Sequence, residues 1–300
     1  MSTLRIGTRG SKLALIQTEM VAELLRTAHA GLDVQTVTIT TAGDKDQTSA
    51  LSAGEGVGWF TTAIQDALLR DEIDVAIHSY KDLPTQRPEG LVIAAVPKRE
   101  DPRDALVSAH GEDFRGLKQG AVVGTSSARR EAQLRAIRPD IEFRQIRGNV
   151  DGRIAKVDAG DYDATVLALA GLRRLGLEQR ANHVFGFEEM LPAPAQGALA
   201  VECRTADAGT RELLTAIDDP VLRQVVAAER TFLATIGGGC SFPAGAYAEH
   251  FGSTLKLHGL LAPDGRIVRQ KMAGPTETAA GLGRALAQEL MALSGMAPKA

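Results

Sequence analysis

The chain has 300 residues, 44% of them hydrophobic and 24% charged, which is enough for two or three domains that each bury a core. Its formal net charge of −3 argues against a nucleic-acid-binding or membrane-surface protein, because both classes usually carry a basic excess. Its two cysteines, Cys203 and Cys240, exclude a disulfide framework and fit a reducing compartment.

The chain begins MSTLRIGTRG, without the apolar stretch of a signal peptide. Apolar runs such as residues 164–172 are too short to cross a bilayer. We therefore expect a cytoplasmic protein with no membrane partner and no nucleic-acid partner.

The first hundred residues alternate β-rich runs with helical patterns, which predicts an α/β fold with a largely parallel sheet. A polar, glycine-rich stretch at residues 43–58 is expected to form a mobile loop. The expected strands cover residues 4–7, 34–40, 74–78 and 91–96, and the expected helices cover residues 11–28, capped by Ser11, and 59–69.

The pattern breaks at residues 97–103 and again at 191–197, with a self-contained βαβα block between the breaks. This arrangement predicts one α/β lobe inserted into another, with the two crossings acting as a hinge above a cleft. The block has expected strands at residues 121–124, 141–146 and 164–169 and helices at 127–137 and 150–159, and a further strand follows at 198–203.

The last part of the chain predicts a small α+β domain, with a helix at 220–236, strands near 244–248, 254–261 and 267–273, and a closing helix at 276–293. The expected domain boundaries are 1–98 with 198–217 for the first domain, 103–192 for the second and 218–300 for the third.

Polar clusters follow two of the first strands, where ligands bind in open α/β sheets. In GTRGS, Arg9 follows the first strand and Ser11 begins a helix. This arrangement predicts either an anion-binding site at the helix N-terminus or a surface arginine beside an ordinary helix cap. In HSYKDLP, Lys81 and Asp82 form either a loop salt bridge or a catalytic carboxylate beside an ammonium group.

A third cluster, GTSSARR, places Thr125, Ser126 and Ser127 before a helix whose first turn carries Arg129 and Arg130. Two arginines at a helix N-terminus oppose the helix dipole unless an anion relieves them, so this cluster predicts an anion site. The pattern is neither a phosphate-binding Walker loop nor a GxSxG nucleophile elbow.

In the fourth cluster, RQIRGNVDGR, Arg147 and Arg153 bracket a Gly-Asn turn. The two arginines are expected either to face the same cleft or to belong to a solvent-exposed charged surface. Of the 34 basic residues, 25 are arginine, and 12 of these lie between positions 101 and 200. An anionic small ligand explains this excess, and so does a genome that prefers arginine codons.

Cys240 follows three glycines in IGGGCSFPAG, which leaves its thiol exposed on a flexible loop and suited to covalent modification. Cys203, within the strand ALAVEC, is expected to be buried and inert. The six histidines are scattered and no HExxH or CxxC pair occurs, so we expect no metal site. GEGVG has no strand before it, which argues against a dinucleotide site.

HSYKDLP, REDPRDALVS, GTSSARR, RGNVDGR, PAPAQGALAVECR and GGGCSFPAGAYA together resemble the porphobilinogen deaminase family over essentially the whole chain. The resemblance implies an α/β fold with two type II periplasmic-binding-protein-like lobes around a cleft, plus a small α+β C-terminal domain. It implies hydroxymethylbilane synthase activity, in which four porphobilinogen molecules are joined head to tail with loss of ammonia and water releases the linear tetrapyrrole. It also implies a monomer.

The same resemblance implies a dipyrromethane cofactor attached through a thioether to Cys240, and Asp82 as the catalytic residue. The implied cofactor-binding residues are Cys240, Lys81, Ser11, Thr125, Ser126, Ser127, Arg129, Arg130, Asp44 and Arg147. The implied substrate-binding residues are Arg9, Arg153, Arg174, Gln196 and Phe60. Two cofactor rings and four substrate rings carry twelve carboxylates, which would account for the arginines.

The segment GEGVGWF departs from the family's common GGKGLF pattern, with Val57 in the place of the lysine and Glu55 nearby, so it loses a cation and gains an anion. Two other functions use the same arginines: a non-catalytic binding protein for a polyanionic metabolite, and an enzyme for phosphorylated substrates. Neither has a use for the GGGC loop.

Overall fold

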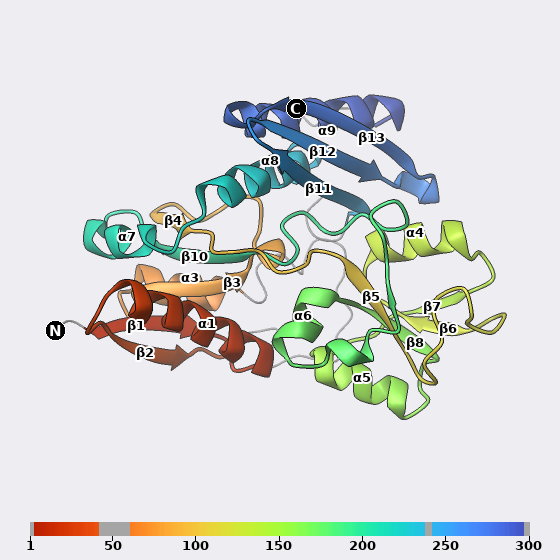
Figure 1. Cartoon of the computed structure of the whole chain (residues 1–300), viewed down its shortest axis with the longest axis horizontal. Coiled ribbons are helices and arrows are strands. Elements are labelled where there is room, and N and C mark those ends of the chain that lie inside the picture. Colours follow the sequence, from red (N-terminus) through yellow and green to blue (C-terminus); the bar gives the residue numbers. More distant parts are fainter. Residues whose placement is uncertain (1–2, 42–60, 238–241, 297–300) are drawn as a thin grey trace. The chain divides into compact units, whose positions relative to one another are not determined.

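The computed structural model describes residues 3–41, 61–237 and 242–296 (Figure 1). The segment expected to be a mobile loop and four residues of interest, Asp44, Glu55, Val57 and Phe60, therefore lie outside the described residues, as does Cys240. The chain divides into two compact units, residues 1–100 with 198–223 and residues 101–197 with 224–300.

The first unit contains a five-stranded sheet with the strand order β2-β1-β3-β10-β4. Strand β1 is parallel to β2 and β3, whereas β10 is antiparallel to both β3 and β4. Four strands thus run in one direction, which confirms the expected largely parallel sheet. The strands are β1 (Thr3–Thr8), β2 (Asp33–Thr38), β3 (Val75–Ser79), β4 (Leu91–Ala95) and β10 (Leu199–Arg204).

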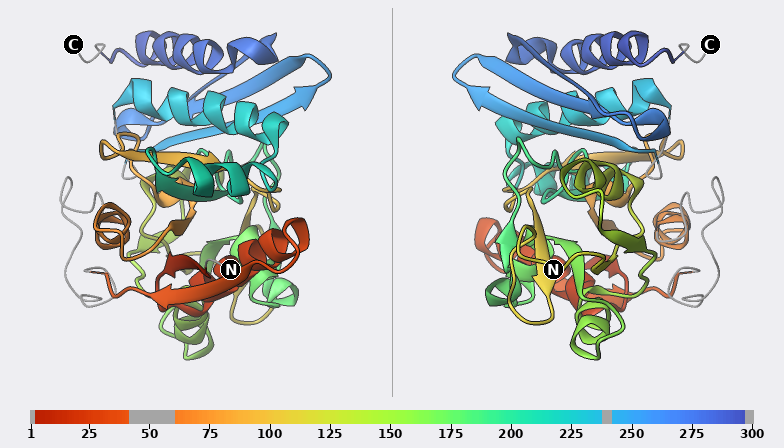
Figure 2. Two further views of the ribbon diagram at one scale, coloured as in Figure 1. Left: turned by 90° about the vertical axis from the view of Figure 1, so that its left-hand side faces the viewer. Right: turned by 90° about the vertical axis from the view of Figure 1, so that its right-hand side faces the viewer.

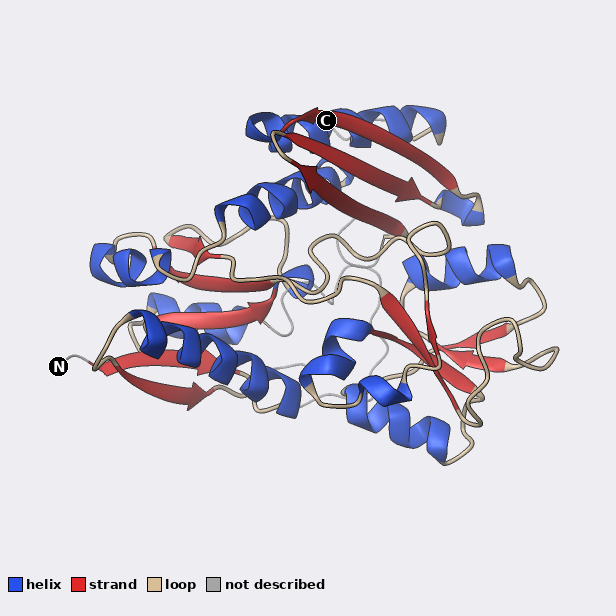
Figure 3. Ribbon diagram, viewed as in Figure 1, coloured by secondary structure: helices blue, strands red, loops and turns tan. Residues whose placement is uncertain are grey.

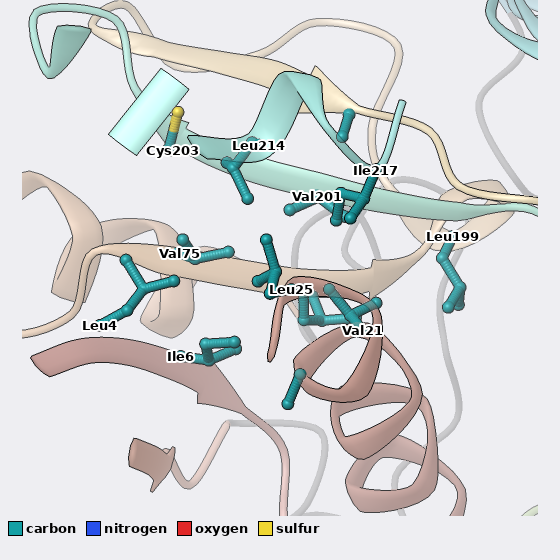
Figure 4. Packing of buried hydrophobic residues seen from close by; sticks show 13 residues of the cluster. Leu4, Ile6, Val21, Leu25, Val75, Leu199, Val201, Cys203, Leu214 and Ile217 are labelled. Carbon is teal, nitrogen blue, oxygen red and sulfur yellow. The ribbon is translucent and has the colours of Figure 1, made fainter. Parts of the chain in front are cut away.

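Helices cover both faces of this sheet. Val21 and Leu25 of α1 pack with Val201 and Cys203 on one face (Figure 4), and Ile64 of α3 packs in a separate cluster with Ala76 and Leu91. The helices are α1 (Lys12–Ala28), α3 (Thr62–Leu69) and α7 (Ala208–Thr215), and a 3-10 turn covers Tyr80–Asp82. Ser11 caps α1 as expected, because its hydroxyl accepts the Ala14 N–H at 3.3 Å.

The second unit repeats this topology in the sheet β7-β6-β8-β5-β9. Strands β6, β7 and β8 are parallel, and β5 is antiparallel to β8 and β9. In both sheets the reversed strand is the first strand after a crossing, β5 after residues 97–103 and β10 after residues 191–197. The strands are β5 (Asp104–Ser108), β6 (Val122–Gly124), β7 (Glu142–Arg144), β8 (Ala164–Ala168) and β9 (His183–Val184).

Helices lie on both faces of this sheet (Figure 3), and side chains alternate between the two faces along β5. Leu106 packs with Leu134 of α4, whereas its neighbours Ala105 and Val107 pack with Ile154 of α5 and with α6. The helices are α4 (Ala128–Ile137), α5 (Val150–Asp158) and α6 (Leu169–Arg174), with a 3-10 turn at Glu178–Arg180.

The C-terminal part holds an antiparallel sheet in the order β11-β12-β13, with α9 packed along it (Figure 2). The elements are α8 (Pro220–Ile236), β11 (Ala244–Phe251), β12 (Thr254–Leu261), β13 (Val268–Pro275), α9 (Ala279–Leu293) and two 3-10 turns, Pro263–Gly265 and Thr276–Thr278. Close packing requires Gly283 in α9, because a Cβ there would lie 2.2 Å from the Ala228 carbonyl oxygen of α8.

Within the second unit, the C-terminal sheet docks on the inserted lobe. The rings of Phe187 and Tyr247 stack at 3.9 Å, and Arg269 donates to the carbonyl oxygens of Glu188 and Glu189. These contacts join β11 and β13 to the segment that follows β9.

Most expected elements are present, with ends that differ by a few residues. Four short elements were not predicted, namely β5, α6, β9 and α7. Strands β5 and β9 and helix α6 have six residues or fewer, and α7 has eight. Segments this short leave little length in which a hydrophobic period can develop. No helix in the described ranges is both long enough and apolar enough to traverse a bilayer.

Candidate functional site

Arg9 and the Lys81–Asp82 pair lie at the same edge of the first sheet. Strands β1 and β3 are parallel neighbours with Ile6 opposite Val75 and Gly7 opposite Ala76, and both strands end immediately before these side chains (Figure 1). The carboxyl ends of parallel strands meet at one edge, so the two sequence clusters form one site within this unit.

The Lys81–Asp82 turn is held by backbone and side-chain hydrogen bonds. The Tyr80 N–H donates to the Ala198 carbonyl oxygen at 3.0 Å, and the Gln17 amide of α1 donates to the Ser79 hydroxyl at 3.0 Å. Asp82 is exposed, and among the described residues no hydrogen bond or ion pair reaches its carboxylate. The loop salt bridge considered for Asp82 is therefore absent from this part of the chain.

A buried polar network lies behind this turn, on β3, β10 and α3. Glu202 is completely buried, and its carboxylate lies 3.1 Å from His78 Nε2 and accepts from Gln65 Nε2 at 3.2 and 3.1 Å. Both buried oxygens are thereby satisfied, as a buried carboxylate requires. The network fixes β3, which leads into the Asp82 turn, against β10, which follows the second crossing.

The hydroxyl cluster of the second unit staples the β6–α4 loop to the loop after β7. Ser126 Oγ donates to the Ile146 carbonyl oxygen at 2.8 Å and accepts the Ile146 N–H at 3.2 Å. Thr125 Oγ1 accepts the Ser127 N–H at 3.2 Å, and Ser127 Oγ caps α4 by accepting the Arg130 N–H at 3.4 Å. These hydroxyls shape the loop beside Arg147.

Arg147 and Arg153 lie on either side of a turn at Gly148, whose φ of 111° favours glycine. Arg153 Nε donates to the Gly148 carbonyl oxygen at 2.8 Å, which orders this turn. Within the described ranges no hydrogen bond or ion pair involves the Arg147 guanidinium, and its side chain is half-buried. The Arg147 guanidinium therefore has N–H donors that no described residue uses.

Arg129 and Arg130 are buried, and the anion that relieves their charge at the start of α4 is Asp104 of β5. Arg129 Nη1 and Arg130 Nη2 each lie 2.7 Å from the carboxylate, which has no exposed surface. Burial by itself would raise the pKa of the Asp104 carboxyl, but the two guanidinium groups outweigh burial and hold that pKa well below its usual range. The anion that the helix-dipole argument requires is thus supplied, at least in part, by Asp104 of the chain itself, and an anionic ligand at this helix stays a prediction.

Gln196, in the second crossing, joins the Asp104 network, and Arg174 holds the backbone of the same crossing. Gln196 Nε2 donates to Asp104 Oδ1 at 2.9 Å and to the Pro102 carbonyl oxygen at 2.7 Å, which joins the two crossings. Arg174 Nη2 donates to the Gly197 carbonyl oxygen at 2.7 Å. The neighbouring Ala195 has a positive φ of 64°, which is rare for a residue with a side chain.

Three buried acids that matter here were missed from the sequence, namely Asp104, Glu202 and Glu229. Glu229 of α8 accepts the Ala195 N–H at 2.6 Å and the Ala248 N–H at 2.9 Å, so it ties the second crossing to β11. A signal for Asp104 existed, because two adjacent arginines require a counter-charge and an aspartate opens the apolar run DALVS.

The two cysteines differ in what the structure describes. Cys203 is completely buried, and burial raises the pKa of its thiol to about 11, which confirms the expected inert cysteine. Cys240 lies outside the described residues. Among the residues that are described, no three or more His, Cys, Asp or Glu side chains gather as metal ligands would.

The chain matches two family descriptions that together span nearly its whole length. Residues 4–212 match "Porphobilinogen deaminase, dipyromethane cofactor binding domain", and residues 223–292 match "Porphobilinogen deaminase, C-terminal domain". The chain belongs to the porphobilinogen deaminase family.

Relatives of known name agree with this membership. Porphobilinogen deaminase of Roseiflexus castenholzii is 47% identical over 297 residues, which is 99% of this chain and 98% of that protein. Porphobilinogen deaminase of Xanthomonas axonopodis pv. citri is 48% identical over 292 residues, 97% of this chain and 96% of that protein.

Among solved structures, a YaeC-family lipoprotein from Enterococcus faecalis superposes with a TM-score of 0.44 at 15% identity, over 73% of this chain and 93% of that one. The periplasmic VFT2 domain of Bordetella pertussis BvgS superposes with a TM-score of 0.43 at 15% identity, over 72% of this chain and 86% of that one. The α/β fold itself is established by the two sheets described above.

The described residues fit a dipyrromethane cofactor, whose two rings carry carboxylate side chains. Arg147 has unused donors, and Arg129 donates through Nη1 alone, with its Nε and Nη2 free of hydrogen bonds to described residues. Guanidinium groups with free donors beside a helix N-terminus are the groups that bind carboxylates in proteins.

Proposed function

We propose that this chain is a hydroxymethylbilane synthase, a transferase that joins four porphobilinogen molecules head to tail with loss of ammonia. Water then releases the linear tetrapyrrole. The observation that supports this proposal most strongly is the match to both domains of the porphobilinogen deaminase family at residues 4–212 and 223–292. Cytoplasmic location and a monomeric state stay predictions.

In this proposal dipyrromethane is attached through a thioether to Cys240 and, when bound, supplies the free pyrrole carbon to which the first substrate is joined. Arg129 and Arg147 bind its carboxylates, because both have unused guanidinium donors in the described part of the chain. The other proposed cofactor contacts are Arg130, Ser11, Lys81, Thr125, Ser126, Ser127 and Asp44. The proposed substrate contacts are Arg9, Arg153, Arg174, Gln196 and Phe60.

Asp82 performs the central electrostatic task in the proposed reaction. As ammonia leaves the aminomethyl group of porphobilinogen, positive charge develops on the carbon and the pyrrole ring. A carboxylate near the pyrrole N–H stabilises that charge in the transition state. Asp82 suits this role because it is exposed at the sheet edge and forms no hydrogen bond to other described residues. At the same edge, Arg9 binds a substrate carboxylate and Lys81 binds a carboxylate of the cofactor.

The first test is the intact mass of the purified protein. The proposal expects an excess equal to two linked pyrrole units, which peptide mapping assigns to Cys240. A protein of unmodified mass is then incubated with porphobilinogen. A synthase loads itself and releases the tetrapyrrole, whereas a protein that neither carries nor acquires the pyrroles contradicts the proposal.

Two substitutions separate attachment from chemistry. Cys240→Ser should yield protein without the covalent chromophore, and a normally loaded variant would refute the attachment site. Asp82→Asn should keep the cofactor mass and lose about 100-fold or more in turnover. Glu89→Gln is the matched control, since Glu89 is another exposed acid a few residues further along the chain, and it should keep wild-type turnover.

A further inference from the structure

Arg269 of β13 directs every side-chain hydrogen bond that it forms with a described residue to the inserted lobe. Its Nη1 donates to the Glu188 carbonyl oxygen. Its Nη2 donates to the Glu189 carbonyl oxygen and to Gln133 Oε1, both at 3.1 Å. Glu188 and Glu189 follow β9, whereas Gln133 belongs to α4. One side chain of the C-terminal sheet therefore contacts two separate segments of the inserted lobe.

The acceptors of the Arg269 guanidinium are all neutral. Burial lowers the pKa of this guanidinium, and the nearby Glu188 opposes the change. The Glu188 carboxylate itself pairs with Lys271 at 3.1 Å, and within the described ranges no carboxylate lies within ion-pair distance of Arg269. Hydrogen bonds from a charged donor are stronger than those from a neutral donor and depend on geometry, so they hold Arg269 and its acceptors in one arrangement.

Gln133 connects this contact to the backbone of α4 and of the second crossing. It is 1% exposed, and it uses both amide hydrogens and both lone pairs of its oxygen. Its Nε2 donates to the carbonyl oxygens of Arg129 and Leu191 at 3.2 and 3.1 Å. Its Oε1 accepts the Leu191 N–H at 2.8 Å as well as the Arg269 N–H. Since the Arg129 guanidinium donates to the Leu191 carbonyl oxygen, Gln133 links Arg269 to the residue that orients Arg129.

Apolar packing and a backbone hydrogen bond join the same two parts beside this network. Leu191 packs in one buried cluster with Leu260 of β12, and the Ala246 N–H of β11 donates to the Pro192 carbonyl oxygen at 3.1 Å. A Cβ at Gly245 would lie 3.0 Å from the Leu191 Cβ and from its carbonyl oxygen, so β11 passes the crossing at very close range. All three strands of the C-terminal sheet therefore take part in the contact.

We infer that Arg269, acting through Gln133, is a positioning residue that keeps the C-terminal sheet and α4 in one fixed arrangement while the pyrrole chain grows. The C-terminal sheet follows Cys240, the proposed attachment site, and α4 carries Arg129, a proposed carboxylate contact. Space for the added rings then comes from parts of the protein other than this contact. The reaction in this inference rests on the proposed function, whereas the fixed arrangement rests on contacts within the second unit.

The first test ties the two parts together covalently. Glu188→Cys and Lys271→Cys replace an exposed ion pair, and a short linker with two methanethiosulfonate groups joins the thiols through disulfides that dithiothreitol cleaves. Intact mass counts the substrate units that the linked protein adds. It should add all four, with a kcat within about twofold of that of the cleaved protein, because the exposed pair contributes little. A linked protein that stops at an intermediate of fewer units, and completes the chain after cleavage, overturns the inference.

The second test compares two arginines of the C-terminal part. Arg269→Gln removes the charged contact with the inserted lobe. Arg266→Gln is the matched control, because Arg266 is exposed and donates to the Leu293 carbonyl oxygen within the C-terminal part itself. Arg269→Gln should raise the KM for porphobilinogen by about threefold or more, with a smaller change in kcat, because the carboxylate-binding groups lose their fixed spacing. Arg266→Gln should keep the wild-type KM, and equal KM values in the two variants would refute the positioning role.

The linker also separates a positioning role from a merely structural one. It is closed in a protein that combines Arg269→Gln with the substitutions Glu188→Cys and Lys271→Cys. Closing it should restore the KM, because the covalent tie replaces the lost contact between the same two parts. A KM that stays raised in the linked protein contradicts the inference.

Hydrogen exchange tests the fixed arrangement without the reaction. The Leu191 N–H donates to Gln133 Oε1, so its exchange reports on this link. Arg269→Gln should speed exchange in peptides that cover residues 187–192, and Arg266→Gln should not. If the wild type itself neither carries nor acquires cofactor, the proposed function fails, and the arrangement is judged on exchange alone. Exchange that is unchanged in Arg269→Gln shows that the arrangement does not depend on Arg269.

Discussion

Ser126 and Ile146 are joined by two hydrogen bonds that run in opposite directions. The hydroxyl of Ser126 donates to the carbonyl oxygen of Ile146 and accepts its N–H, at 2.8 and 3.2 Å. The residue after Ile146 is Arg147, a guanidinium with unused donors in the described part of the chain. The serine therefore fixes the backbone next to the half-buried Arg147, in addition to the cofactor contact proposed for it.

The first prediction concerns this pair. Ser126→Ala removes both hydrogen bonds and should lower the free energy of unfolding by about 1–2 kcal/mol while raising the KM for porphobilinogen more than it changes kcat. Ser253→Ala is the control, because Ser253 is exposed at the turn between β11 and β12. Urea unfolding and steady-state kinetics measure both effects. An unchanged KM in Ser126→Ala would show that the loop holds its position without this serine.

The second prediction uses two His–Glu pairs that differ in burial. Glu202 is fully buried against His78, whereas Glu249 lies 2.9 Å from His258 with a side chain that is 32% exposed. Glu202→Gln places an amide among donors from His78 and Gln65, so it should lower the free energy of unfolding by about 1–3 kcal/mol.

Glu249→Gln is the matched control and should cost less than about 1 kcal/mol, since exposed ion pairs contribute little. Urea unfolding of the two variants at one pH gives the comparison. Equal losses of unfolding free energy in the two variants would contradict the prediction that burial strengthens the Glu202–His78 pair.

The third prediction concerns the pH dependence of Cys203. Burial raises the pKa of this thiol to about 11, above the ordinary value of about 8.5. The stabilisation that follows from this shift is complete below about pH 8.5 and is lost as the pH rises through 11. In native protein at pH 8, iodoacetamide should leave Cys203 unlabelled, and unfolding in urea should expose it to labelling. Labelling of the native thiol at a rate typical of free cysteine would contradict its burial.

The fourth prediction compares two glycines of one helix. A Cβ at Gly283 would lie 2.2 Å from the Ala228 carbonyl oxygen, whereas a Cβ at Gly281 meets nothing within 4 Å. Gly283→Ala should therefore destabilise the protein by about 1–3 kcal/mol through overpacking. Gly281→Ala should stabilise it by about 0.5–1 kcal/mol, because alanine favours the helix. Thermal unfolding gives both signs, and two shifts of the same sign would refute the close packing of α8 and α9.

Local patterns in the sequence predicted the elements that have length and a clear period. The cap at Ser11, the helix ending at Ala28 and the strand over Thr254–Leu261 follow from residue type and alternation within a few positions. Strand β9 was not predicted, because two residues carry no periodicity of their own and acquire their pairing from β5.

The sequence by itself determined the candidates for the proposed chemistry: a carboxylate after a buried strand, hydroxyls and arginines at a helix start, and a cysteine in a glycine loop. Only the tertiary structure decided which of these charges are already compensated. Asp104 meets Arg129 and Arg130 across 25 and 26 positions of chain, and Glu202 meets His78 across 124. Such pairs form where elements from distant segments are buried side by side, because a buried charge needs a partner that is close in space, whatever their separation in sequence.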